Sequence, residues 1–430
     1  MPSSPSGPPA RRRIAVVGSG VSGLTAAHVL QRAADVTLFE ADDRPGGHAH
    51  SHDQTDAAGR GLAVDTGFIV HNERTYPELL RLFSELRVRT QPTEMSMSVR
   101  CGGCGLEYAG SKGLPGLFPS VRNAVDPRYL ALLAQVLRFH RRALRALADP
   151  TPARREETMT AFLARGRFGA YFVSHFVTPL ISAVWSCAPE RAGDYPARYL
   201  FQFLGNHGML GVRGAPPWMT VVGGSREYVR KAVESLSEVR LSTPVHSLER
   251  TTHGVEIRSG DLEPSMFDAA VIATHPDQAL ELLARPTAEE RRVLGAIGYS
   301  TNPTILHSDP AVLPRAPRAR ASWNYYLPDC HASASSVNVT YDMNRLQRLP
   351  GDTRYLVTLN DAGTVGADSV IERMTYHHPL YTPASVGAQA ELPALNRDRL
   401  AFAGAYHGWG FHEDGCRSGV AAAASLGVTW

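Results

Sequence analysis

The stretch Ile14-Ala-Val-Val17-Gly18-Ser-Gly20-Val-Ser-Gly23 joins a short apolar run directly to three glycines spaced as Gly-x-Gly-x-x-Gly. The residues after it have helical spacing through Ala33, and Val36-Thr-Leu-Phe39 then predicts a second strand that ends in Glu40. Glycines at these positions permit a tight turn, close approach of the backbone to a pyrophosphate and close helix–strand packing. The sequence therefore predicts a β-turn-α-β unit that binds a dinucleotide, with Glu40 placed to accept ribose hydroxyls.

The residues after Glu40 decide between two kinds of dinucleotide. Glu40 is followed by Arg44-Pro-Gly46-Gly47, and Val64-Asp65-Thr66-Gly67-Phe68 comes a little later. These segments resemble the flavin-containing amine oxidase superfamily, in which an acid followed by Arg-x-Gly-Gly folds over the FAD pyrophosphate and the second segment runs beside the isoalloxazine. A Rossmann NAD dehydrogenase would explain the first forty residues but not the Arg-x-Gly-Gly segment.

Two distant segments extend the resemblance along nearly the whole chain. Thr243-Pro-Val245, with the strands expected after it, resembles the hairpin and returning strand on the adenine side, and Val245 takes the adenine-contacting position. Leu400-Ala-Phe-Ala-Gly404 and the segment containing Asp414 and Gly415 resemble the closing strand and helix that cover the flavin ribityl chain and pyrimidine ring. Phe68 to Pro77 and Gly408 to Gly415 further resemble a bacterial subgroup of predicted NAD/FAD-binding amine oxidoreductases.

The resemblance implies an α/β fold in which a Rossmann-like FAD-binding domain is interrupted by a discontinuous α+β substrate domain that caps the flavin. We expect residues 1–12 to form a disordered tail. The expected FAD-binding domain comprises residues 13–75, 220–289 and 396–430. The expected substrate domain comprises residues 76–219 and 290–395.

The chain departs from the amine oxidase pattern at two positions. The residue after the Gly-Gly pair, commonly an arginine that touches the pyrophosphate, is His48, whose charge at neutral pH is at most partial. The acid usual after Ala-Gly in the last strand is replaced by Ala405. Glu413 or Asp414 could serve nearby, although both stand where a helix start is expected and capping is the alternative explanation.

The substrate-pocket candidates lie mostly beside the helix expected to cover the flavin. His407, Trp409 and Phe411 precede that helix directly, and Tyr376 is the candidate for the second position of an aromatic cage around the ring. Many amine oxidases also hold a water near flavin N5 with a lysine. Only Lys112 and Lys231 are lysines, and neither lies in a segment expected near the flavin. The catalytic side chains are therefore left open.

A lipid-like substrate is favoured over an amine. Residues 128–147 predict an amphipathic helix with apolar residues at 130, 133, 137, 144 and 147 and arginines mostly off that line. Such a helix either docks by its apolar face, which is favoured, or lies on an anionic membrane surface. The charge-free residues 169–189 could line an apolar tunnel. The superfamily includes carotenoid desaturases, fatty-acid isomerases and protoporphyrinogen oxidases, and the subgroup has been linked to modified acyl chains. We therefore expect desaturation or double-bond isomerisation of an acyl or polyene substrate.

Composition limits the remaining functions and partners. The 430 residues carry 44 Lys+Arg against 41 Asp+Glu, a net charge of +3, with 43% hydrophobic residues. This balance gives no support to nucleic-acid binding, and no run of 18 apolar residues suggests a spanning helix. No signal peptide is recognisable, so we expect a cytoplasmic protein, with peripheral membrane contact as an alternative. An amine oxidase, and a flavin-binding redox partner without turnover, remain open as functions.

We expect no metal site. His48-x-His50-x-His52 would put three imidazoles on one strand face, but it follows the pyrophosphate glycines directly, and crowding against FAD explains it more simply. Cys101-Gly-Gly-Cys104 has no second cysteine pair and is typical of a hairpin tip, with a redox dithiol as the alternative. Cys416, near the flavin-covering segment, is a candidate for covalent flavin attachment.

Overall fold

The computed structural model describes residues 11–430 apart from 57, 150, 152–155, 212–213, 261–262 and 331–336. Residues 1–10 of the expected tail lie outside the described residues. The first strand, β1 (Arg12–Val17), begins at Arg12, which is the last residue assigned to that tail. Ile14 to Val17 is buried throughout, as expected of a strand covered on both faces of a parallel sheet.

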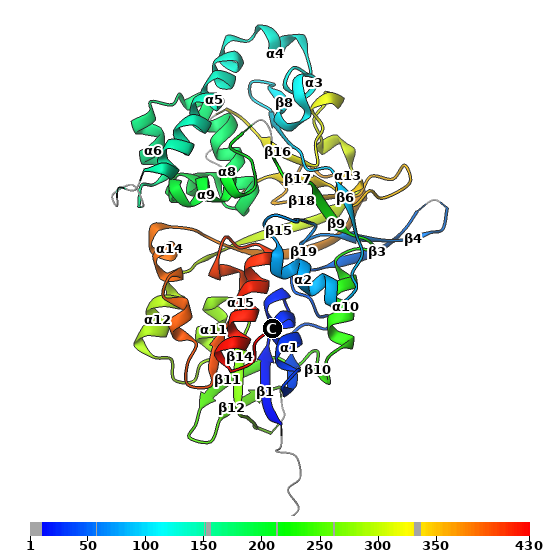
Figure 1. Ribbon diagram of the computed structural model, residues 1–430. Coiled ribbons are helices and arrows are strands. Elements are labelled where there is room, and N and C mark those ends of the chain that lie inside the picture. Colours follow the sequence, from blue (N-terminus) through cyan, green and yellow to red (C-terminus); the bar gives the residue numbers. More distant parts are fainter. Residues whose placement is uncertain are drawn as a thin grey trace, which may run out of the picture.

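A five-stranded, wholly parallel sheet forms the lower half of the molecule in Figure 1. In spatial order its strands are β10 (Glu238–Arg240), β2 (Ala34–Phe39), β1, β14 (Ala269–Ile272) and β20 (Leu400–Phe402). Because parallel strands end at the same edge, the segments after β1, β2, β14 and β20 converge there. These strands and α1 (Val21–Leu30) confirm the predicted βαβ unit and the α/β fold.

Both faces of this sheet are covered. One face packs against α1, α2 (Pro77–Glu85), α10 (Arg226–Glu234) and α15 (His412–Ser425). The other face packs against β11 (Val245–Arg250), β12 (Val255–Ser259), β13 (Ser265–Phe267), α11 (Pro276–Leu282), α12 (Ala288–Gly295) and α14 (Pro383–Gln389). The predicted hairpin on the adenine side is thus present as β11 and β12. In Figure 1, α15 lies beside α1 although the two helices come from opposite ends of the chain.

The position of α2 differs from the predicted domain division, which assigned residues from 76 onward to the substrate domain. Leu79, Leu82 and Phe83 of α2 are buried in the same core as α1 and α15. The apolar residues of α2 lie on one face, so the helix needs a core to cover that face, and the nearest one belongs to the parallel sheet. The chain therefore enters the second half of the molecule after α2.

A seven-stranded mixed sheet organises the upper half. In spatial order its strands are β19 (Val370–Pro379), β15 (Tyr299–His307), β18 (Leu356–Leu359), β17 (Val339–Asp342), β16 (Trp323–Leu327), β7 (Met97–Cys101) and β8 (Glu107–Ala109). Its helices are α3 (Gly113–Leu117), α4 (Val121–Val125), α5 (Pro127–Ala148), α6 (Met159–Gly166), α7 (Ala170–Phe172), α8 (Thr178–Trp185), α9 (Ala197–Asn206) and α13 (Met343–Leu346). A π-helical turn, Val173–Val177, separates α7 from α8.

The helix α5 is present as predicted, but the face that it buries is not the predicted one. Its buried residues are Tyr129, Leu132, Phe139 and Ala143, whereas Leu130, Leu137 and Leu144 are exposed by 43%, 52% and 51%. The aromatic rings of Tyr129 and Phe139 have more apolar surface to bury than leucine, and they set the face that docks. An apolar line spaced by seven residues is therefore left at the surface.

Two small sheets join the halves. One pairs β3 (Ser51–Thr55) with β4 (Gly61–Asp65), and the other contains β5 (Val70–Asn72), β9 (Trp218–Val221) and β6 (Thr90–Thr93). The buried carboxylate of Asp65 accepts hydrogen bonds from the Ser225 backbone N–H at 2.9 Å and from the Gln347 amide at 2.8 Å. Burial raises the pKa of Asp65 to about 6. Asp65 thus ties β4 to the start of α10 and to the segment after α13.

Candidate functional site: a dinucleotide cradle beside an aromatic wall

The glycine loop after β1 has one open position between two crowded ones. A Cβ atom on Gly18, whose φ is +99°, would lie 2.8 Å from the Ala273 carbonyl oxygen, and one on Gly23 would lie 1.9 Å from the Gly18 carbonyl oxygen. At Gly20 a Cβ would meet nothing within 4 Å. Gly18 and Gly23 therefore hold the turn against β14, while the backbone at Gly20 faces free space at the N-terminus of α1, a place that suits an anionic group such as a pyrophosphate.

The second fingerprint lies directly against this loop. The Gly46 N–H donates to the Ser19 carbonyl oxygen at 3.2 Å, and a Cβ on Gly47 would lie 3.2 Å from the Gly20 Cα. The Glu40 carboxylate accepts the Ser19 N–H at 2.8 Å, so it orders the loop. Glu40, Gly46 and Gly47 thus lie against the glycine turn.

Two buried nitrogen atoms at this place have no hydrogen-bond partner in the described part of the chain. The Arg44 guanidinium donates one N–H to the Gly47 carbonyl oxygen at 3.0 Å, and its Nη1 is buried without a partner. The His48 Nε2 is buried and unpaired as well. Because buried polar groups are normally satisfied, the unpaired guanidinium N–H of Arg44, beside the open Gly20 backbone, fits a bound anion such as a pyrophosphate.

The predicted adenine side meets the end of β2. The Glu40 N–H donates to the Arg240 carbonyl oxygen at 2.9 Å, and the Thr243 N–H donates to the Glu40 carbonyl oxygen at 2.8 Å. Val245 follows two residues later, half-buried, at the start of β11. Glu40 and Val245 are therefore held close together by backbone bonds, which is the arrangement that a ribose and its base require.

Thr66, Gly67 and Tyr376 form a junction between the two halves. The Thr66 hydroxyl lies 2.6 Å from the Tyr376 hydroxyl, whose ring centroid is 5.0 Å from that of His48. A Cβ on Gly67 would lie 2.1 Å from the His48 carbonyl oxygen, so only glycine permits this approach. Tyr376, on β19, thus reaches the dinucleotide segments, whereas the sequence assigned it to an aromatic cage.

The sequence analysis missed a histidine in this region. The His275 ring is 6.4 Å from that of His48 and stacks on Tyr299 at 4.2 Å. It stands just after β14, at the carboxyl edge of the parallel sheet, and that placement is the signal that could have revealed it. Burial lowers the pKa of His275 to about 4 and that of His378 to about 4, and it lowers the pKa of His48 well below its usual range. These imidazoles are therefore neutral at physiological pH.

The C-terminal segment closes over α1. The Gly404 N–H donates to the Ser418 hydroxyl at 2.9 Å, and a Cβ on Gly415 would lie 2.6 Å from the Val21 side chain. The Asp414 carboxylate accepts the Phe411 N–H at 3.1 Å and pairs with Arg417. Asp414 therefore caps α15, in line with the alternative explanation for this residue.

The remaining two residues considered for the flavin region also have protein partners. The Glu413 carboxylate accepts the Leu79 N–H at 3.0 Å and so stabilises the N-terminus of α2, where burial raises the pKa of Glu413 to about 7. The Cys416 thiol is buried 3.4 Å from the Thr25 hydroxyl of α1. Both side chains thus contribute to the packing of α15 against its neighbours.

Two of the predicted pocket residues come together in an aromatic wall. Phe411 stacks on Phe203 of α9 at 4.9 Å, and the Trp409 ring lies 5.8 Å from that of Tyr199. The Trp409 carbonyl oxygen accepts the indole N–H of Trp185 at 2.9 Å. His407 is not part of the wall. Its ring contacts that of Tyr406 at 4.7 Å, and burial lowers its pKa to about 4.

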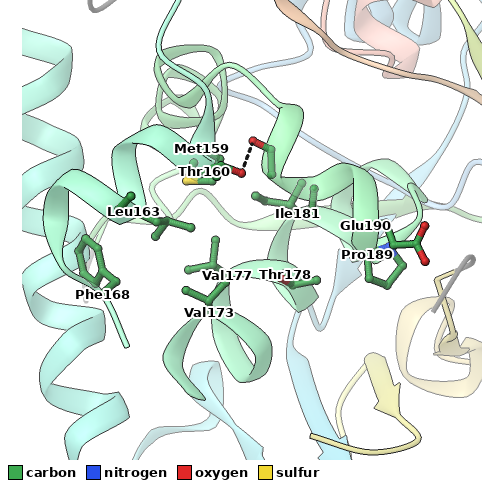
Figure 2. Close-up of a pocket in the computed structure, with 13 residues that line it drawn as sticks. Met159, Thr160, Leu163, Phe168, Val173, Val177, Thr178, Ile181, Pro189 and Glu190 are labelled. Atoms are coloured by element: carbon green, nitrogen blue, oxygen red, sulfur yellow. Dashed lines mark hydrogen bonds between the residues drawn. The ribbon is translucent and has the colours of Figure 1, made fainter. Parts of the chain in front are cut away.

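A pocket of about 360 Å³, lined mainly by apolar residues together with Thr160, Thr178 and Glu190, lies between α6, the π-helical turn and α8. Figure 2 shows Leu163, Val173 and Val177 pointing toward one another, with Ile181 close by. Val173, Val177 and Ile181 belong to the charge-free residues 169–189. Glu190 is the one charged residue among the lining residues in the described part of the chain. This pocket is a second place, besides the aromatic wall, where an apolar group can be buried.

The model of the flavin containing amine oxidoreductase family matches residues 21–308, which is more than half of the chain. The chain belongs to this family. The members of this family are flavin-containing oxidoreductases, and the open Gly20 backbone with the unpaired Arg44 nitrogen fits FAD as the cofactor. None of the helices in the described part of the chain is long and apolar enough to cross a membrane.

Individual proteins and solved structures are similar to the chain over part or most of its length. Protoporphyrinogen oxidase 2 of Arabidopsis thaliana is 30% identical over 191 residues, which span 42% of this chain and only 34% of that relative. Cyclohexylamine oxidase from Brevibacterium oxydans superposes with a TM-score of 0.67 at 17% identity, covering 97% of this chain and 98% of that one. A fatty acid isomerase from P. acnes superposes with a TM-score of 0.65 at 15% identity, covering 95% and 97%. At such identities the structural matches show the fold alone.

Proposed function

We propose that this FAD-dependent oxidoreductase acts on an apolar, lipid-like substrate, an acyl chain or polyene, and desaturates it or isomerises its double bonds. The observation that carries the proposal is the pocket of about 360 Å³, in which apolar side chains from α6 and from the charge-free residues 169–189 outnumber Thr160, Thr178 and Glu190. A pocket of that composition gains free energy by burying hydrocarbon, at about 25 cal/mol per Å² of apolar surface, and offers little to a charged group.

The side chains in the cofactor region suit such chemistry. When bound, FAD accepts a hydride, so the protein has to orient a substrate C–H bond and exclude water. Trp409 and Phe411 with Phe203 supply a rigid apolar surface for that purpose. His275 and His378 are buried and neutral, so they add no fixed charge to the region around the cofactor segments. Tyr376 and Thr66 fix the cofactor segments through their hydroxyl contact.

The two lysines have structural tasks, which favours the lipid proposal over an amine oxidase. The Lys231 ammonium donates to the Arg87 carbonyl oxygen at 2.6 Å, and the Lys112 ammonium donates to the Arg320 carbonyl oxygen at 3.1 Å. A structural neighbour named as a fatty acid isomerase shows that the same fold accommodates acyl chemistry. The match to cyclohexylamine oxidase keeps amine oxidation as the alternative to be tested.

We also propose that the exposed face of α5 contacts anionic membranes, where a lipid-like substrate would be found. Leu137 and Leu144 are about half exposed, and Arg141 and Arg145 lie on the same exposed face. On α4, Val121 is 82% exposed. A face that combines exposed apolar side chains with arginines is attracted by acidic headgroups and buries its apolar side chains among acyl chains.

The substrate class is tested by anaerobic mixing of the flavin-loaded protein with an amine panel and with a panel of unsaturated and methyl-branched acyl chains. We expect acyl compounds to bleach the flavin absorbance or to yield double-bond isomers, which are sought by chromatography because isomerisation can leave the flavin oxidised. Bleaching by amines alone would reject the lipid proposal. No bleaching and no product from either panel would favour a flavin-binding partner without turnover.

The membrane contact is tested by sedimentation with vesicles. We expect the protein to sediment with vesicles that contain phosphatidylglycerol and less with neutral vesicles. Leu137→Asp should reduce sedimentation about tenfold, since burying a leucine side chain contributes about 1.5–3 kcal/mol. Ala131→Asp is the matched control. Ala131 is also exposed on α5, and its substitution introduces the same charge but removes little apolar surface. Equal sedimentation of all variants would exclude α5 as the contact surface.

A further inference from the structure

The tip of the β7–β8 hairpin meets two distant segments of the substrate half. Two cysteines come from the hairpin tip, a third from the segment just after β16, and a histidine from the π-helical turn. Their side-chain ligand atoms all lie within 4.8 Å of one another. This cluster, called the Cys3His cluster below, consists of Cys101, Cys104, His175 and Cys330. We propose that the Cys3His cluster binds one zinc ion as a closed, structural site.

Two of the distances within the cluster match those of a tetrahedral zinc site. Cys101 Sγ and Cys330 Sγ are 3.7 Å apart, and Cys104 Sγ and His175 Nε2 are 3.5 Å apart. Zinc–sulfur bonds of about 2.3 Å and zinc–nitrogen bonds of about 2.0 Å, at tetrahedral angles, place two sulfurs about 3.8 Å apart and a sulfur and a nitrogen about 3.5 Å apart. All three cysteines are free thiols in the structure.

The histidine is oriented as a ligand. His175 is fully buried, and its Nδ1 lies 2.8 Å from the Ser174 hydroxyl oxygen and 3.0 Å from the Tyr171 carbonyl oxygen, both of which can accept its N–H. Donation of the Nδ1–H to that carbonyl selects the tautomer whose Nε2 lone pair faces the sulfurs, which is the usual outer-shell arrangement at zinc-binding histidines. The π-helical geometry of Val173–Val177 is a local departure from the α-helix, and such turns are frequent at functional sites.

Close packing explains the two glycines between the hairpin cysteines. A Cβ on Gly102 would lie 2.6 Å from the Pro328 carbonyl oxygen, and a Cβ on Gly103 would lie 3.0 Å from the Asp329 Cα. The Gly102 N–H also donates to the Leu327 carbonyl oxygen at 2.8 Å. A larger residue at either glycine would therefore push away the segment that brings Cys330 to the cluster. The Gly-Gly centre, which the sequence analysis attributed to a hairpin tip alone, has this second consequence.

A nearby cation matches the charge of the occupied site. Three thiolates and a neutral imidazole around Zn²⁺ carry a net charge of −1. The Tyr171 hydroxyl lies 3.5 Å from Cys104 Sγ, and the Arg128 guanidinium lies over the Tyr171 ring, 5.4 Å from its centroid. A positive charge at the edge of the cluster favours the anionic complex over the neutral thiols.

The site is structural because the chain fills all four tetrahedral positions, leaving none for a reacting molecule. Its task follows from the π-helical turn, which presents His175 to the cluster and Val173 and Val177 to the apolar pocket. Zinc would join this turn to the hairpin tip and to the segment after β16. It would therefore hold one wall of the pocket in place.

Metal analysis of the flavin-loaded protein, expressed with added zinc and purified without chelators, tests the proposal. We expect about one zinc per chain. His175→Phe keeps a ring that can stack on Tyr171 but removes the ligand nitrogen, so it should lower the zinc content at least about tenfold, as should Cys104→Ala. Cys187→Ala is the matched control, since Cys187 is a buried free cysteine outside the cluster, and it should keep its zinc. Equal zinc in all four proteins would overturn the assignment.

The unmodified protein provides a second test that does not depend on variants folding. Titration of its thiols with a mercurial reagent should release one zinc in step with the modification of three cysteines, and cobalt in place of zinc should give the absorption of a tetrahedral thiolate site. A metal-free protein that takes up neither ion would overturn the proposal. So would a disulfide within the cluster, detected by intact mass, or one iron per chain in place of zinc.

Discussion

The parallel sheet and the mixed sheet carry sites of different kinds. At the parallel sheet the cradle is made of backbone: Gly18 and Gly23 hold a turn whose open position, Gly20, faces the space for a pyrophosphate. At the mixed sheet the Cys3His cluster and the apolar pocket are made of side chains that come from segments far apart in the chain. The first kind of site depends above all on glycines that keep the backbone open, and the second depends on which side chains the fold brings together.

The largest effect is expected from substitutions in the glycine turn that forms the backbone cradle. Gly23→Ala places a Cβ 1.9 Å from the Gly18 carbonyl oxygen, so the βαβ turn has to open, and we expect purified protein that is almost free of flavin and less stable. Gly20→Ala meets no protein atom within 4 Å, so the fold should be unchanged while the FAD affinity falls about 100-fold through contact with the pyrophosphate.

Flavin absorbance per chain and thermal unfolding of the flavin-free protein separate these two effects. Gly387→Ala, at an exposed position of α14 with open space around it, is the control and should bind flavin normally. If Gly20→Ala binds FAD as tightly as the unmodified protein, the pyrophosphate does not lie over Gly20.

The next largest effect is expected when the cationic side chain of the cradle, Arg44, is removed. Arg44→Ala should weaken FAD binding by about 10- to 100-fold, because a hydrogen bond to a charged group contributes about 1.5–3 kcal/mol. Arg44→Lys should recover only part of this affinity, since the guanidinium also donates to the Gly47 carbonyl oxygen. Titration of flavin-free protein with FAD gives the dissociation constants. Arg230→Ala, which removes an exposed arginine on α10, should leave them unchanged.

Much of the parallel-sheet half could be predicted because its determinants are local. The spacing of Gly18, Gly20 and Gly23 with Glu40 requires one backbone path, and the structure has it. The roles of Asp414 and Glu413 could not be predicted from local patterns. A carboxylate at the start of a helix can either cap that helix or bind a ligand, and only its hydrogen-bond partners in the structure distinguish the two roles.

The mixed-sheet half was less predictable because its contacts join distant residues. Cys330 and His175 lie 226 and 71 residues from the nearest hairpin cysteine, so no spacing rule connects them. The helix α5 was expected from its period, but the choice between its two apolar lines depended on whether Tyr129 or Leu130 faces the core. That choice is made by the neighbouring helices, which the sequence of α5 does not contain.

A third effect is expected from a substitution that fills the pocket between α6 and α8. Val177→Trp places a large ring among Leu163, Val173 and Ile181, so kcat/KM for apolar substrates should fall about tenfold or more while the flavin content is unchanged. Steady-state kinetics on whichever compound reduces the flavin provides the measurement. Ala131→Trp, on the exposed face of α5, is the control for an added ring. Unchanged kinetics in Val177→Trp would show that the substrate does not enter this pocket.

The smallest effect concerns the pH dependence of stability at His71. This side chain is fully buried, both of its ring nitrogens lack partners in the described part of the chain, and burial lowers its pKa from 6.5 to about 4. Between pH 6.5 and 4 the unfolded chain therefore binds a proton that the folded chain does not. Stability is lost as the pH falls through this window, by up to about 1.4 kcal/mol per pH unit for this one group.

Buried acids act in the opposite direction, because burial raises the pKa of Asp65 to about 6 and the folded protein keeps that proton where the unfolded chain has lost it. The contribution of His71 is therefore isolated by comparing variants rather than by the slope of one protein. His71→Phe should gain stability relative to the unmodified protein as the pH falls from 6.5 to 4, measured by urea unfolding, while His253→Gln, at an exposed turn, should show no such gain. A constant difference between His71→Phe and the unmodified protein at every pH would mean that a partner compensates the charge on His71.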